Sequence, residues 1–191
     1  MGRLTPLDLD NLTPEQQSVY DAMQSGPRGA RHGKLGLVGP FGVWVRAPGI
    51  GDAVQALGAA ARFETSIDEA TKEVAICTVG AHYKARFEFA THQALAIQAG
   101  ISEAATVAIQ QGQIPVFDSE NHKVCHLVAQ QLLDRHCIDN ETYQRATAIW
   151  GEEGMIELVS IIGYYCIVSL TLNAFEVPIV PGMQDPFPDL E

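Results

Sequence analysis

The fold is decided by residues 66–100, which read SIDEATKEVAICTVGAHYKARFEFATHQALAIQAG. Its first four residues, Ser66 to Glu69, have the spacing of a capping box and predict the start of a helix. No charged residue occurs from Val74 to Ala81, so this helix is expected to be apolar nearly all round and buried. A second helix is predicted over 85–99, with Gly100 as its C-cap.

The rest of the chain predicts further helices and no sheet. No segment alternates polar and apolar residues for long enough to indicate a strand. The fold class is therefore predicted to be all-α, as a single domain over 1–191 with an extended tail at 177–191. N-caps, glycines and apolar spacing place the other helices at about 14–25, 49–64, 102–111, 118–135, 139–150 and 155–173.

Composition excludes several classes of protein. There are 12 Lys+Arg against 23 Asp+Glu, a formal net charge of −11, and no basic stripe of the kind that nucleic-acid binding needs. The four cysteines have neither disulfide-ladder nor zinc-knuckle spacing. The uncharged stretch from Leu158 to Ala174 is shorter and more polar than the ~20 apolar residues of a membrane span, so a buried helix of a soluble cytoplasmic protein is expected.

The segment around Glu73 is weakly echoed around Glu157. Each glutamate enters an apolar helix after a capped helix, although the second unit has a longer insert between cap and glutamate. The echo predicts a helical-hairpin duplication.

Glu73 to Ser102 resembles the carboxymuconolactone decarboxylase family, which has the alkylhydroperoxidase D-like all-helical fold. The family pattern is a glutamate that starts an apolar helix, an aromatic-containing turn, a helix with a histidine, and Ala-Gly-(Leu/Ile)-Ser. Flanking blocks extend the resemblance to about 39–182, in the longer, decarboxylase-like branch. The peroxidase branch has Cys-x-x-Cys-x-x-x-His where this chain has ARFEFATH, residues 85–92, so both cysteines of the dithiol are absent.

The resemblance makes Glu73 and His92 the expected catalytic residues. Glu73 lies on an apolar helical face, where burial raises the pKa of a carboxyl; the alternative is a structural carboxyl paired with Lys72 or Arg86. His92 follows Glu88 by one turn, so Glu88 is expected to fix its tautomer and to leave the other ring nitrogen for substrate. The alternative for His92 is a satisfied core histidine.

Other residues near this segment are expected to contact substrate. Phe89 stands where the family usually has tryptophan, and His82, Tyr83 and Arg86 lie at the helix-to-helix turn, with Arg86 as a carboxylate clamp. A solvated turn is an equal alternative for those three. Tyr164 and Tyr165 are expected to pack rather than to reach the site. In the glycine-rich loop at 26–42, Arg28, Arg31 and Lys34 are expected to be solvated, with a lid as the alternative.

No metal site is expected. His122 and His126 have an i,i+4 spacing that could hold a metal beside Cys125, but no third ligand is defined and a polar helical face explains the pattern equally well.

The resemblance implies a cofactor-independent decarboxylase, or a related lyase, in aromatic compound catabolism. Its substrate would be a small cyclic carboxylate such as a carboxylated lactone, which serves as its own electron sink. The alternatives are a non-catalytic, ligand-binding oligomeric member and, last, a thiol-dependent peroxidase using Cys77. A homo-oligomer, trimer or hexamer, is expected, with the apolar helix 155–174 supplying the interface.

Overall fold

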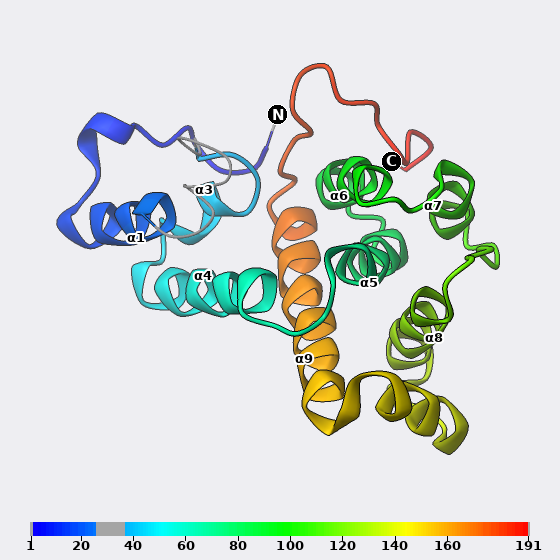
Figure 1. Ribbon diagram of the computed structural model, residues 1–191. Coiled ribbons are helices and arrows are strands. Elements are labelled where there is room, and N and C mark those ends of the chain that lie inside the picture. Colours follow the sequence, from blue (N-terminus) through cyan, green and yellow to red (C-terminus); the bar gives the residue numbers. More distant parts are fainter. Residues whose placement is uncertain (1, 26–36, 191) are drawn as a thin grey trace.

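The computed structural model describes residues 2–25 and 37–190, which form helices and no strand (Figure 1). The all-α prediction is confirmed. The helices are η1 (Leu9–Asn11), α1 (Pro14–Ser25), α3 (Phe41–Trp44), α4 (Pro48–Phe63), α5 (Glu69–His82), α6 (Arg86–Gln98), α7 (Glu103–Gln110), α8 (Glu120–Arg135) and α9 (Asn140–Ala174).

Helix α5 is the centre of the molecule. It packs against α6, α7, α8 and α9, and every residue from Thr71 to Ala81 is buried. This burial confirms the expectation drawn from its uncharged run. Helix α9 runs between the group formed by α1, α3 and α4 and the group formed by α5 to α8 (Figure 1).

Local capping explains where α5 starts, and it differs from the prediction. The N-cap is Asp68, whose carboxylate accepts a hydrogen bond from the backbone N–H of Thr71. Ser66 is instead held by Glu157, which accepts from its backbone N–H at 2.9 Å and from its hydroxyl at 2.6 Å. The capping box predicted at Ser66 is therefore wrong, because a long-range carboxylate takes the serine.

Three other boundaries shift. Helix α8 begins at Glu120 after Ser119 rather than at Asp118, and the loop predicted to run to 42 already enters α3 at Phe41. The break before the last apolar helix lies at Gly151, where φ is 69° and ψ is −177°, a conformation that favours glycine. That break separates the Asp139 cap from Glu157, whereas α5 carries its glutamate without interruption, and the duplication stays a prediction.

Among the described helices, α9 is long and apolar enough to cross a membrane by length and composition. Half of its most apolar 18-residue window is buried within the chain, and core helices of soluble proteins pass the same test. Its length of 35 residues exceeds the predicted uncharged stretch because it comprises two helical segments that meet at the kink at Gly151.

Candidate active site

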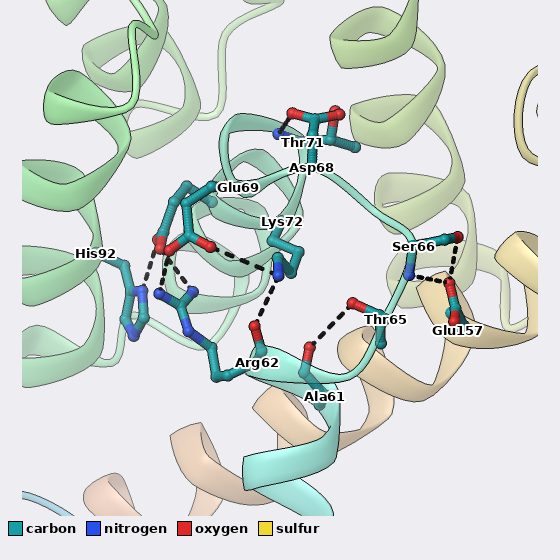
Figure 2. Close-up of polar contacts among 11 residues, drawn as sticks. Ala61, Arg62, Thr65, Ser66, Asp68, Glu69, Thr71, Lys72, His92 and Glu157 are labelled. Atoms are coloured by element: carbon teal, nitrogen blue, oxygen red, sulfur yellow. Dashed lines mark hydrogen bonds and ion pairs between the residues drawn. The ribbon is translucent and has the colours of Figure 1, made fainter. Parts of the chain in front are cut away.

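Four helices meet at one buried polar cluster (Figure 2). Helix α4 supplies Arg62 in its last turn, α5 supplies Glu73, and α6 supplies Glu88 and His92. Tyr165 of α9 covers the histidine ring. Helix α5 contacts both α6 and α9, and α4 also contacts α9. These contacts bring the side chains together.

Glu73 and His92 form the tightest contact of the cluster. Oε2 of Glu73 lies 2.6 Å from Nδ1 of His92, the length of a charge-assisted hydrogen bond in which the ring N–H donates. Glu73 has no exposed surface, while the His92 side chain keeps 11% of its own. The structure thus brings the two expected catalytic residues into contact, and the short bond fixes the orientation of the imidazole.

Glu88 contacts the other ring nitrogen, and less favourably than expected. Its Oε1 lies 3.1 Å from Nε2 of His92, close enough for an ion pair, but it makes no hydrogen bond within the described residues because the N–H is not aligned with it. The expected roles are thus exchanged. Glu73 orients the ring through Nδ1, and Glu88 stands beside Nε2 without binding it firmly.

Arg62 is the residue that sequence reasoning missed. Its two terminal nitrogens donate to Oε1 of Glu73 and to Oε1 of Glu69, each at 2.6 Å. Lys72 donates to the backbone carbonyl of Arg62 at 2.7 Å and lies 3.5 Å from Glu69. The pairing of Glu73 with Lys72 or Arg86 is therefore wrong. The only sequence signal was a single arginine near the end of a helix rich in small residues.

The charges of the cluster balance when His92 is protonated. Burial disfavours its imidazolium, but Glu73 and Glu88 outweigh burial and raise the pKa of His92 to about 9. Burial likewise opposes ionisation of Glu73, and His92 with Arg62 overcomes it and lowers the pKa of that carboxyl. At neutral pH the site therefore holds a buried imidazolium between carboxylates, contrary to the raised pKa expected for Glu73.

Tyr165 belongs to the site, whereas Phe89 belongs to the core. The Tyr165 ring stands edge-on to the His92 ring, with centroids 5.2 Å apart, and burial raises the pKa of its phenol well above the ordinary value. Tyr165 is buried and packs, as expected, and the ring against which it packs is that of His92. Phe89 is fully buried and packs on Phe187 at 5.4 Å.

The turn residues expected to bind substrate lie elsewhere. Arg86 faces the C-terminal tail, where its Nε lies 3.4 Å from Asp185 and its guanidinium donates to the carbonyl of Leu190. His82 pairs with Asp134 at 3.5 Å, and its ring contacts that of Tyr83. His82 and Tyr83 line a cavity of about 310 Å³ beside α8 and α9, away from the polar cluster.

The candidate metal ligands on α8 make other contacts, and the candidate reactive thiol is buried. Nδ1 of His126 lies 2.9 Å from the Thr78 hydroxyl, and Cys125 donates to the carbonyl of Thr71. No group of three or more His, Cys, Asp or Glu residues in the described part of the chain could hold a metal ion. Cys77 is completely buried, and burial raises the pKa of its thiol well above its ordinary value. Arg28, Arg31 and Lys34 lie outside the described residues.

No family model and no curated protein matches the chain. Two crystal structures of the debrominase Bmp8 do resemble it. The apo form has 16% identity and a TM-score of 0.71, and a cysteine-to-alanine variant in complex with 2,3,4-tribromopyrrole has 18% identity and a TM-score of 0.69. Each match covers 93% of this chain and 91% of the other. The likeness confirms the all-helical, alkylhydroperoxidase D-like fold and carries nothing finer.

Proposed function

We propose that the protein is a cofactor-independent lyase that transfers a proton through His92, with decarboxylation of a small cyclic carboxylate as its reaction. The observation that carries the proposal is the unequal treatment of the two ring nitrogens. Nδ1 of His92 is held at 2.6 Å by Glu73. The N–H at Nε2 is not aligned with Glu88, and the His92 side chain keeps 11% of its surface exposed. A held imidazolium with one free N–H is a general acid.

The reaction follows from that acid. The bond between the ring carbon and the substrate carboxylate breaks, carbon dioxide leaves, and the electron pair delocalises into the conjugated lactone carbonyl as a dienolate. The imidazolium stabilises this charge and then gives its Nε2 proton to carbon, and solvent returns one proton to His92. Glu73 and Arg62 keep the ring oriented throughout.

Arg86 has no part in this proposal, although the resemblance suggested it as a carboxylate clamp. Its guanidinium is engaged by Asp185 and by the carbonyl of Leu190. Arg62 is likewise saturated by Glu69 and Glu73. Within the described polar cluster, the cation left to face a substrate is the His92 imidazolium itself.

The comparison adds modest support for an enzyme. Bmp8 is a debrominase, and one of its structures is a complex with 2,3,4-tribromopyrrole, so a protein of similar fold is an enzyme that binds a small ring. Thiol chemistry is not proposed for this chain, since the Cys77 thiol is buried and its pKa is raised. Conversion of Cys77, Cys125, Cys137 and Cys166 to alanine is expected to leave activity intact in folded protein.

The test is His92→Gln assayed by carbon dioxide release from a carboxylated lactone, without added metal or thiol. Turnover is expected to fall by ~10²–10⁴, because the variant keeps a polar side chain but has no titrating nitrogen. His122→Gln is the control, since this histidine lies on α8 beside Phe117. Full turnover by folded His92→Gln protein contradicts the proposal.

One observation favours a second property, association of copies of the chain. Large apolar side chains are exposed along one stripe of α9, with Ile156 the most exposed at 68%. The others of this stripe are Val159, Ile167 and Leu170. We propose that this stripe forms a homo-oligomer interface, and sedimentation at micromolar concentration tests it; a monomer contradicts it.

A further inference from the structure

Two buried side-chain polar atoms in the described part of the chain make no hydrogen bond. One is Oε1 of Glu88 and the other is the hydroxyl of Ser169 on α9. Ser169 has no exposed surface, so contact with bulk solvent does not relieve it. A buried polar group without a partner is costly, and it calls for an explanation.

The register of α6 against α9 places these two atoms at the same level. Asn173 donates to the carbonyl of Tyr83, just before α6, while Tyr165 stands against His92. The two helices therefore run antiparallel. On α9, Ser169 lies one turn after Tyr165 and one turn before Asn173. On α6, Glu88 lies one turn before His92. One such turn covers roughly 6 Å along the helix axis. Ser169 consequently faces the Glu88 level.

We propose that Ser169 is a positioning residue whose hydroxyl donates to Oε1 of Glu88 once His92 has lost its Nε2 proton. This inference rests on the proposed function. While His92 is charged, Glu88 has an ion-pair partner at 3.1 Å. After proton transfer, Nε2 presents a lone pair to that carboxylate, whose buried Oε1 then needs another donor. Ser169 supplies it.

Few charged or titratable groups surround Glu88 and His92. Glu73 and Cys77 face it from α5, Arg62 reaches it through Glu73 from α4, and Tyr165 faces it from α9. Arg62 is occupied by two carboxylates, and the Cys77 thiol stays protonated. The Ser169 hydroxyl is thus an uncommitted donor at the level of Glu88.

The test is the pKa of His92, followed by ¹H–¹⁵N NMR of its ring in wild-type and Ser169→Ala protein. The hydroxyl favours the neutral ring by stabilising Glu88 beside it, so its removal is expected to raise the pKa of His92 by about 1. Ser169→Thr, which keeps the hydroxyl, is expected to restore the wild-type value. Ser160→Ala is the control, because that exposed serine of α9 donates to the carbonyl of Ile156.

An unchanged or lowered pKa of His92 in folded Ser169→Ala protein overturns the proposal. A changed melting temperature without a changed pKa also overturns it, since that result is what a packing role alone produces. The NMR readout does not depend on turnover. An active His92→Gln enzyme would therefore defeat the proposed function while the Ser169 measurement still stands or fails by itself.

Discussion

The stability of this protein is expected to fall as pH rises from about 6.5 to about 9, and His92→Gln is expected to remove that dependence. The cause is the buried ion pair with Glu73 and the neighbouring Glu88, which raises the pKa of His92 from 6.5 to about 9. A histidine whose pKa is higher in the folded state stabilises the fold fully below its unfolded pKa. That contribution is lost as pH rises through the folded pKa.

The size of the effect follows from the same two values. One pKa unit corresponds to 1.36 kcal/mol, so the contribution of His92 to the free energy of unfolding is of the order of 3 kcal/mol. The lowered pKa of Glu73 reports the same ion pair from its other side and is not added to this figure. The contribution of Glu73 to the free energy of unfolding is lost at acidic pH, because stabilisation by a carboxyl of lowered pKa disappears as pH falls through its folded pKa.

The assay is urea unfolding of wild-type and His92→Gln protein at about pH 6, 7.5 and 9.5, with His122→Gln as control. Wild type and control are expected to lose the same few kcal/mol over this range, while His92→Gln stays nearly level. The difference between the proteins isolates His92 from other groups that titrate there. Parallel curves for all three proteins would refute the assignment of a buried imidazolium.

Three further predictions concern other parts of the fold. Arg62→Met removes the partner of Oε1 of the fully buried Glu73 and one partner of the part-exposed Glu69, and it is expected to cost about 3–5 kcal/mol of unfolding free energy in urea titrations; a loss under 1 kcal/mol contradicts the geometry. Gly51→Ala places a methyl 2.2 Å from the carbonyl oxygen of Trp44 and is expected to lower the free energy of unfolding by about 1–3 kcal/mol. Gly49 has open space around it, so Gly49→Ala is the control and is expected to be neutral or stabilising. Ile156→Glu puts a charge on the exposed stripe of α9 and is expected to shift the sedimentation coefficient toward that of a monomer; an unchanged coefficient removes this stripe from the interface.

Local patterns in the sequence were sufficient to predict the elements of the fold. The uncharged run before His82 predicted a buried helix, and α5 is buried along its length. Capping at Thr13 and Ser102 predicted where α1 and α7 begin. These signals are local, since a cap or an apolar face depends on residues within one or two turns.

Partners across helices could not be predicted in this way. The spacing from Glu88 to His92 suggested that Glu88 holds the ring, but the short bond goes to Glu73, 19 residues away. Arg62 comes from a third helix and Tyr165 from a fourth, and no local pattern indicated that either would meet Glu73 or His92. Ser66 was similarly diverted from its predicted cap by Glu157.

The sequence by itself determined the all-helical class, most helix boundaries and the choice of Glu73 and His92 as the residues to examine. Tertiary structure alone decided which ring nitrogen is locked, which cation neutralises Glu73, and which buried polar atoms, Oε1 of Glu88 and the hydroxyl of Ser169, make no hydrogen bond among the described residues. The reason is geometric. Helical periodicity tells which residues share a face, but the crossing angle and register of packed helices determine which faces meet, and these depend on all side chains between them.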